Sequence, residues 1–320
     1  MKCLVTGGAG FIGSHVAQAL CARGARVVVL DNLSLGNLKN LAWKKDSDAL
    51  EFVQGEITDN GLVRDLIKGC DWVFHEAALP SVPLSVAKPI ETNRDNLDAG
   101  LELLVAARDA KVKRFLFASS SAIYGDSDVP LKHESHSPNP LSPYALQKYT
   151  TEKYAQMFWQ LYGLETVSFR YFNAFGPRQS FDSPYSGVIA KFCTAILEGQ
   201  APTIFGDGQQ SRDFVYIDNV VEANLLGAEQ SPERVAGKVF NIGCGVSINL
   251  LQLLEELNRQ TGHSIAPRFE PARVGDVRSS RPDIAAAIKY LGYDPRISWQ
   301  EGLKETLEFY RSEAQSRNVS

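Results

Sequence analysis

The chain has 320 residues, about twice a typical single-domain length, so it can bury one large core or two lobes. Hydrophobic residues make up 44% and charged residues 22% of it, which is close to the average for globular proteins and excludes a disordered or low-complexity chain. The formal net charge of -4 excludes the broadly basic surface that nucleic-acid binding requires, but it allows a small anionic ligand held by a few arginines.

The cysteines and the apolar segments bound the cellular setting. The five cysteines are scattered and never form a Cys-x-x-Cys pair, so neither a disulfide framework nor a zinc site is predicted. No apolar run approaches the roughly 18 residues of a membrane span, and the chain starts without the pattern of a secretory signal. We therefore expect a cytoplasmic protein that binds no membrane.

The first half of the chain alternates short β-branched runs with longer helical patterns. This alternation is typical of βαβ units and predicts an α/β fold with a doubly wound parallel sheet of the Rossmann type. Ser142-Pro143 marks the start of one helix, because serine is a favoured N-cap and proline is tolerated at the first helical position. The predicted strands are 2–6, 26–31, 52–54, 72–75, 115–119 and 166–171, and the predicted helices are 12–23, 60–69, 92–111 and 143–162.

The pattern becomes less regular after about residue 174. Loops rich in Gly, Pro, Ser and Asp separate helices predicted at 187–199, 249–262 and 300–313. We expect residues 1–173 to form the Rossmann domain, with the catalytic residues, and residues 174–320 to form a smaller C-terminal α/β lobe that binds substrate. The boundary between them is soft because segments of the two parts interleave.

A glycine-rich loop directly follows the first predicted strand. It reads both as Gly8-x-Gly10-x-x-Gly13 and as Gly7-x-x-Gly10-x-x-Gly13, and a helix begins within it. Such a loop lets the backbone approach a pyrophosphate at a helix N-terminus. Asp31 ends the next strand, where an acid binds the adenosine ribose and disfavours a 2′-phosphate, so NAD is expected rather than NADP. The alternative for Asp31 is a turn residue.

Two Tyr-x-x-x-Lys pairs lie on the helix predicted at 143–162. Tyr144 and Lys148 share one face of it, and so do Tyr149 and Lys153, and spacing alone does not choose between them. A tyrosine that acts as a base near neutral pH needs its pKa lowered by an ammonium group and by the positive cofactor ring. Residues 119–121 are serines at the end of a strand, where a hydroxyl can contact a reacting sugar oxygen or simply solvate a turn.

The glycine loop, Asp31, Ser120 and the Tyr144/Lys148 pair together resemble the extended short-chain dehydrogenase/reductase family, and in particular its nucleotide-sugar epimerases. The likeness covers essentially the whole chain. It implies that Tyr144 rather than Tyr149 is the base, and that the catalytic residues are Ser120, Tyr144 and Lys148. It also implies that NAD is contacted by Gly7, Gly10, Phe11, Ile12, Gly13, Asp31, Asn32, Ser34, Glu56, Ile57, Ala77, Ala78, Tyr144, Lys148 and Tyr171.

The same resemblance bears on the reaction. Dehydratases of the family carry an Asp-Glu pair after the catalytic hydroxyl, and its decarboxylases keep the glutamate, whereas this chain has Ser121 and Ala122. What is implied is reversible C4 epimerisation of a UDP-hexose through a 4-keto intermediate, with Tyr144 as base and then acid. The alternatives are a UDP-glucuronate 4-epimerase, a nucleotide-sugar 4-keto-reductase that consumes its cofactor, and a non-enzymatic NAD sensor.

Substrate contacts are likewise implied by the resemblance. The family's diphosphate-binding arginines match Arg212 and Arg273, and arginine suits phosphate oxygens. Ser280, seven positions after Arg273, matches a site where tyrosine excludes an N-acetyl group, so both UDP-N-acetylhexosamines and UDP-glucose/UDP-galactose are expected. The relatives imply a homodimer through helices 92–111 and 143–162. The implied substrate contacts are Ser81, Ser120, Ser121, Tyr144, Asn173, Val188, Thr203, Phe205, Arg212, Arg273, Asp276 and Ser280.

Some positions depart from the family pattern or invite another interpretation. Glu56 stands where an aspartate usually contacts the adenine, and Pro80 stands where some relatives have a cofactor-contacting lysine. His75 is interpreted as a packing residue at the end of a strand. His133 and His136 lie in one loop, but no third ligand is evident, so no metal site is predicted.

Overall fold

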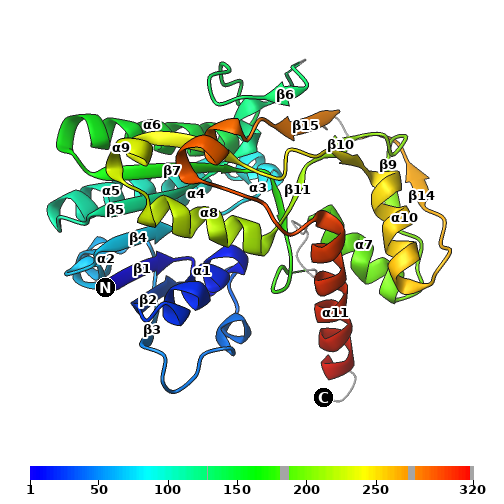
Figure 1. Cartoon of the computed structure of the whole chain (residues 1–320), viewed down its shortest axis with the longest axis horizontal. Helices are drawn as coiled ribbons and strands as arrows, with labels where there is room; N and C mark the ends of the chain where they lie inside the picture. The colour runs from blue at the N-terminus through cyan, green and yellow to red at the C-terminus, as the bar shows by residue number, and fades with distance from the viewer. Residues whose placement is uncertain (128, 181–186, 273–277, 318–320) are drawn as a thin grey trace.

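The computed structural model describes residues 1–127, 129–180, 187–272 and 278–317, and the largest feature among them is a seven-stranded sheet (Figure 1). Its strand order is β12-β7-β5-β4-β1-β2-β3, and every adjacent pair is parallel. This arrangement confirms the predicted Rossmann-type fold. The strands are β1 (Lys2–Thr6), β2 (Arg26–Asp31), β3 (Leu50–Gln54), β4 (Trp72–His75), β5 (Arg114–Ser120), β7 (Glu165–Tyr171) and β12 (Lys238–Ile242).

Helices cover both faces of the sheet, so successive residues of each strand enter different cores. Leu4 and Val28 belong to the apolar cluster under α2, α5 and α6, whereas Val5 and Val29 belong to the cluster under α1 and α8. Strands buried on both sides read as continuous apolar runs, which is why they were recognisable in the sequence. The bounds are α1 (Phe11–Ala22), α2 (Asn60–Ile67), α5 (Ala99–Asp109), α6 (Pro143–Tyr162) and α8 (Ile217–Glu229).

The predicted elements of the first half are present with small shifts at their ends. The helix expected at 92–111 is a continuous series of α4 (Pro89–Asn93), a π-helical turn η2 (Arg94–Asp98) and α5. Helix α6 begins at Pro143 as predicted, and the Ser142 hydroxyl accepts a hydrogen bond of 3.2 Å from the Ala145 amide. The shorter elements are η1 (Leu38–Leu41), α3 (Val82–Ala87), η3 (Ser121–Tyr124) and β6 (Leu131–Lys132).

The sequence did not predict α8 and β12. Together with β7 they continue the strand–helix–strand pattern, and β12 pairs with β7 at the edge of the main sheet. They were missed because the chain between β7 and α8 passes through α7 and several short strands, which interrupt the alternation. Residues far beyond 173 thus contribute to the main sheet, in line with the expected interleaving, while the division into two domains at 173 stays a prediction.

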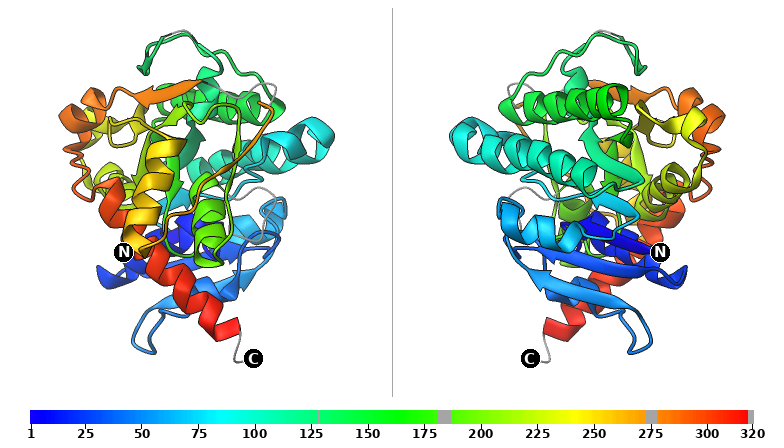
Figure 2. Two further views of the ribbon diagram at one scale, coloured as in Figure 1. Left: turned by 90° about the vertical axis from the view of Figure 1, so that its right-hand side faces the viewer. Right: turned by 90° about the vertical axis from the view of Figure 1, so that its left-hand side faces the viewer.

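The remaining helices gather beside the main sheet (Figure 1). α7 (Val188–Leu197), α10 (Leu250–Thr261) and α11 (Trp299–Arg317) contact one another and correspond to the three helices predicted for the second half. The segment that contains β6 projects from the rest of the molecule (Figure 2). The other elements are β8 (Asn173–Phe175), β9 (Thr203–Phe205), β10 (Ser211–Arg212), β11 (Phe214–Tyr216), α9 (Pro232–Val235), β13 (Ile248–Asn249), β14 (Arg268–Glu270), β15 (Ser279–Pro282) and η4 (Ala287–Leu291).

Among the helices that the structure describes, none is both long and apolar enough to cross a membrane.

Candidate active site

A cavity of about 1030 Å³ lies at the carboxyl end of the main sheet. Its lining includes residues that end or directly follow β1, β2, β4, β5 and β7, together with the first two turns of α6. The sheet order reverses between β1 and β4, and this switch point is where doubly wound folds bind ligands. The volume reaches the upper end of the range for ordinary small-molecule sites, so there is room for more than a single small ligand.

The glycine loop forms a cradle at one wall of this cavity. Gly7 has a φ of +67°, and a Cβ atom on it would lie 2.7 Å from the Ala77 nitrogen. A Cβ on Gly13 would lie 2.3 Å from the Gly7 carbonyl oxygen, so only glycine fits at either position. Gly10 precedes α1 without a capping side chain, and the first turn holds no acidic residue. The exposed amides and the helix dipole therefore fit an anionic diphosphate.

Asp31 is held rigidly at the next part of the cavity wall. Its carboxylate accepts hydrogen bonds of 2.9 Å from the Ala9 amide and 2.8 Å from the Leu33 amide, and only 7% of the residue is exposed. A Cβ on Gly36 would lie 2.5 Å from an Asp31 oxygen, so the following loop also approaches it closely. This geometry fits the predicted role of Asp31 at an adenosine ribose.

Glu56, which stands where the family usually has an aspartate, is hydrogen-bonded to another residue of the cavity wall. Its Oε2 atom accepts a hydrogen bond of 2.9 Å from the Asn32 side chain, and both residues line the cavity. This bond places Glu56 beside Asn32 in the cavity wall, and its contact with the adenine stays a prediction.

Ser120, Tyr144 and Lys148 meet at the opposite end of the cavity. Ser120 ends β5, and its hydroxyl lies close enough to the Tyr144 phenol to lower the pKa of that phenol. Lys148 is 3% exposed, and its ammonium group donates a hydrogen bond of 2.8 Å to the Ala118 carbonyl oxygen. All three residues line the cavity.

The second Tyr-x-x-x-Lys pair lies elsewhere on α6. Neither Tyr149 nor Lys153 lines the cavity. The Lys153 ammonium instead lies 5.4 Å from the centre of the Tyr149 ring. The structure therefore offers Tyr144, and not Tyr149, to a ligand in this cavity.

Burial sets the pKa values of both Tyr144 and Lys148. It raises the pKa of Tyr144 above its ordinary value, and the nearby Ser120 hydroxyl only partly opposes this. Burial also lowers the pKa of Lys148 to about 8, opposed by the nearby Glu76 carboxylate. Because the ammonium is directed at the Ala118 carbonyl, Lys148 alone does not make Tyr144 a base, and a further positive charge beside the phenol is needed.

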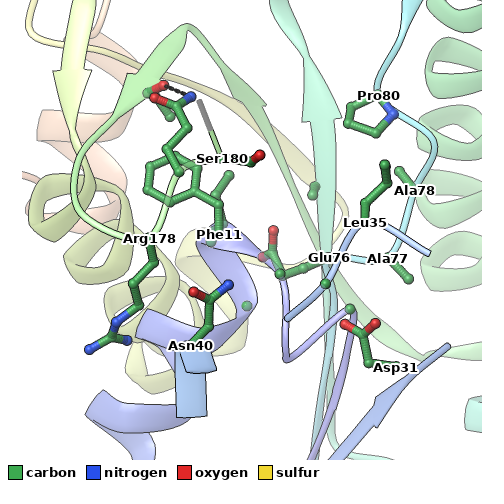
Figure 3. A pocket seen from close by; sticks show the side chains of 18 of the residues that line it. Phe11, Asp31, Leu35, Asn40, Glu76, Ala77, Ala78, Pro80, Arg178 and Ser180 are labelled. Atoms are coloured by element: carbon green, nitrogen blue, oxygen red, sulfur yellow. Dashed lines mark hydrogen bonds between the residues drawn. The ribbon is translucent and has the colours of Figure 1, made fainter. Parts of the chain in front are cut away.

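Sequence reasoning gave no role to Glu76, which directly follows β4 and lines the cavity (Figure 3). Its Oε1 atom accepts a hydrogen bond of 3.1 Å from the Tyr171 hydroxyl, which in turn accepts one of 2.8 Å from the Asn224 amide. Burial raises the pKa of Glu76 to about 7. The sequence feature that could have identified Glu76 is an acidic residue at the carboxyl end of a buried strand.

Arg178 and Asn40 also line the cavity without having been expected there (Figure 3). Arg178 has a φ of +66° and donates hydrogen bonds to Ser14, at 3.5 Å, and to Gln18. It therefore connects the loop after β8 to α1. The only sequence feature that pointed to Arg178 is its position directly after a Gly-Pro pair.

His75 and the His133/His136 loop have structural roles. His75 Nδ1 shares a hydrogen bond of 2.9 Å with the Thr6 hydroxyl, and burial lowers the pKa of this histidine to about 3. His136 Nδ1 accepts a hydrogen bond of 3.1 Å from the His133 amide. Among the described residues, no group of three or more potential ligands is placed to hold a metal.

The predicted cofactor residues all line this one cavity, and so do the predicted substrate residues Ser120, Ser121, Tyr144 and Asn173. The other substrate residues within the described ranges are not part of its lining. Ser81 is buried and caps α3, Val188 begins α7, and Thr203 and Phe205 lie in β9. Arg273 and Asp276 lie outside the described residues.

Arg212 and Ser280 are brought together from distant parts of the chain. They are register partners in the parallel pair of β10 and β15, and the neighbouring Asp213 amide donates a hydrogen bond of 3.1 Å to the Ser280 carbonyl oxygen. This adjacency supports a shared role at one ligand, although the roles of both residues stay predictions.

The fold and the site define a class of protein: a Rossmann-type enzyme with a dinucleotide cradle and a Ser-Tyr-Lys group at the same cavity. The family model described as "NAD dependent epimerase/dehydratase family" matches residues 3–243. The chain belongs to this family. The match confirms the resemblance found in the sequence, and it confirms that the protein depends on NAD.

Individual relatives match over nearly their whole length. A UDP-glucose 4-epimerase from Mycolicibacterium smegmatis is 38% identical, with 98% of this chain and 100% of the relative covered. The structure of a UDP-N-acetylglucosamine 4-epimerase from Methanobrevibacter ruminantium, in complex with UDP-N-acetylmuramic acid, matches with 40% identity, 98% of both chains and a TM-score of 0.92. A UDP-glucose 4-epimerase from Thermotoga maritima, with UDP-glucose, matches with 41% identity, 98% and 100% coverage and a TM-score of 0.92.

Proposed function

We propose that this protein is an NAD-dependent UDP-sugar 4-epimerase that interconverts UDP-N-acetylglucosamine with UDP-N-acetylgalactosamine, and UDP-glucose with UDP-galactose. The observation that carries the proposal is the joint placement of the glycine cradle, Asp31 and the Ser120–Tyr144–Lys148 group around one cavity. Ser121 and Ala122 stand where a dehydratase needs an acid and a base. The site therefore supports oxidation and reduction at C4 without elimination of water.

The glycine cradle and Asp31 would hold NAD, which when bound accepts a hydride from C4 of the sugar and returns it. The Tyr144 phenolate takes the proton of the C4 hydroxyl and later gives it back, acting as base and then as acid. The Ser120 hydroxyl, which lines the cavity beside the Tyr144 phenol, is placed to bind the same sugar oxygen. Lys148 and the positive charge of the oxidised cofactor together favour the phenolate.

Inversion at C4 requires the sugar to present its other face. A hydride returned from a fixed position in the cavity would reach the second face of C4 only if the hexose turns in between, whereas Tyr144 returns the proton to the C4 oxygen in either orientation. The nucleotide end must stay held during this step. Arg212 is suited to hold that end through the diphosphate, because β10 belongs to a sheet separate from the catalytic strands.

The direct test supplies the purified protein with each UDP-sugar, without added NAD, and follows the C4 epimer ratio by NMR. We expect conversion of both the N-acetylated and the plain hexoses. Tyr144→Phe should lower the rate by a factor of about 10² to 10⁴, the usual contribution of a general acid–base group. Tyr149→Phe is the matched control on the same helix and should retain the parent rate.

Two results would redirect the assignment. Stoichiometric consumption of added cofactor would indicate a 4-keto-reductase, because an epimerase regenerates its cofactor in each cycle. Turnover restricted to UDP-glucuronate would indicate the uronic acid epimerase instead.

We further propose that the protein is a homodimer in which α6 forms part of the interface. Leu146, Met157 and Leu161 of this helix are 53%, 46% and 63% exposed. A helix face with several exposed apolar side chains gains stability when a second copy covers it. The cytoplasmic location stays a prediction, which the five free cysteines support.

A further inference from the structure

A carboxyl group without a full set of partners faces the cofactor cavity. Glu76 Oε1 is bound by the Tyr171 hydroxyl, but Glu76 Oε2 is buried and has no hydrogen-bond partner among the described residues. A buried carboxylate oxygen without a partner is costly, so such an atom indicates a ligand or an ion that completes it. The group lines the cavity itself, and its carboxyl projects into it (Figure 3).

The position of Glu76 identifies which part of a dinucleotide it serves. A Cβ on Gly7 would lie 3.0 Å from the Glu76 carbonyl carbon, so residue 76 abuts the glycine cradle. On its other side, Glu76 Oε1 is bound by the Tyr171 hydroxyl, and Tyr171 is the register partner of Ser120 in the pair of β5 and β7. Asp31 marks the adenosine end of the cavity, and the catalytic group marks the end where the reactive ring must lie. Glu76 therefore stands at the ring end.

We propose that the Glu76 carboxylate is the counter-charge for the nicotinamide ring and makes the protein retain the oxidised cofactor in preference to the reduced one. This inference rests on the proposed function in so far as the cofactor is NAD. The oxidised ring is a cation and the reduced ring is neutral. A carboxylate in a partly dehydrated cavity therefore stabilises the oxidised form selectively, whereas the Lys148 ammonium opposes it.

Preferential retention of the oxidised cofactor suits the reaction cycle of an epimerase. Each cycle must begin with the oxidised cofactor and end with it, although the cofactor is reduced in between. A negative charge beside the ring favours return of the hydride to the sugar. It thereby limits the time during which the ketone can escape.

The test measures binding, not turnover. Purified protein is incubated with equimolar NAD⁺ and NADH until the bound nucleotides no longer change, then separated from free nucleotide and denatured, and the two forms are quantified by chromatography. Glu76→Gln keeps the shape and the bond with Tyr171 but removes the charge. We expect the bound NAD⁺:NADH ratio to fall about tenfold, while Glu76→Asp keeps most of the parent ratio.

Two further measurements separate this role from a structural one. Glu134 is a matched control, because its buried Oε2 atom likewise has no hydrogen-bond partner among the described residues but Glu134 does not line the cavity, so Glu134→Gln should leave the ratio unchanged. The parent protein gives a second test that needs no variant, because burial raises the pKa of Glu76 to about 7 while Lys148, with a pKa of about 8, stays largely protonated below that value. The ratio should therefore fall as the pH is lowered through about 7 and the carboxylate takes up a proton, and this result is available even if Glu76→Gln does not fold.

The outcomes distinguish the two proposals. An unchanged ratio in Glu76→Gln, an equal fall in Glu134→Gln, or a parent ratio that does not change with pH would overturn the role of Glu76 while leaving the epimerase assignment intact. Failure of the parent protein to bind either nucleotide would overturn the NAD assignment itself.

Discussion

The ionisation of Tyr144, the proposed base, depends on its burial and on the charges around it. Tyr144 lies where burial opposes its ionisation, and Lys148 donates to a backbone carbonyl rather than to the phenol. We infer that several charges together, and not one neighbour, make the Tyr144 phenol ionise. This makes the charges of Lys148, Glu76 and the bound cofactor a single coupled system.

The proposed choice of sugar also depends on a single residue. Ser280 lies beside Arg212, and a tyrosine in its place would add a bulky ring on that strand. We expect Ser280→Tyr to lower kcat/KM for UDP-N-acetylglucosamine at least tenfold and to change that for UDP-glucose less than threefold, because only the first substrate needs room for the acetyl group. Parallel kinetics on the two substrates measure this, and equal losses on both would refute the gatekeeper role.

At the scale of elements, the position of α6 relative to the sheet determines the catalytic geometry. Glu152 of α6 accepts hydrogen bonds of 2.8 Å from the Ser119 hydroxyl of β5 and of 2.7 and 3.0 Å from the Arg170 guanidinium of β7. The Glu152 and Arg170 side chains are 0% and 3% exposed. This buried pair connects α6, which carries Tyr144 and Lys148, to β5, which ends at Ser120, and to β7.

Removing one member of that pair should be costly. We expect Glu152→Gln to lower the free energy of unfolding by about 3 kcal/mol, because the Arg170 charge would be left buried without a counter-charge. Denaturant unfolding measures this loss. Glu91→Gln is the control, since Glu91 pairs with Lys88 at the surface, with side chains 53% and 56% exposed, and should change stability by less than about 1 kcal/mol. Similar losses in both variants would contradict the argument.

At the scale of the whole molecule, the exposed face of α6 predicts the assembly. We expect light scattering to give twice the chain mass of 35.2 kDa. A Met157→Asp/Leu161→Asp double variant should be monomeric, because charges in an apolar interface are not compensated. Phe269→Asp, at a residue of β14 that is 55% exposed, is the control and should remain dimeric. A monomeric parent protein would contradict the proposed interface.

Much of the fold and the nucleotide end of the site was readable from local sequence. The buried strands, the glycine cradle, Asp31 and the start of α6 at Pro143 all appear where they were predicted. These features depend on residues close in sequence: runs of apolar residues, the conformational freedom of glycine and the capping of a helix by the serine before it. The chemistry of neighbouring residues is enough to specify them.

Only the tertiary structure decided which distant residues act together. It placed β12 beside β7, set Arg212 beside Ser280, and joined Glu76 to Tyr171 and Asn224. It also turned Tyr144 rather than Tyr149 toward the cavity. None of these relations has a local pattern, because strand order, insertions between elements and the packing of a helix on its sheet are set by contacts between segments far apart in the chain.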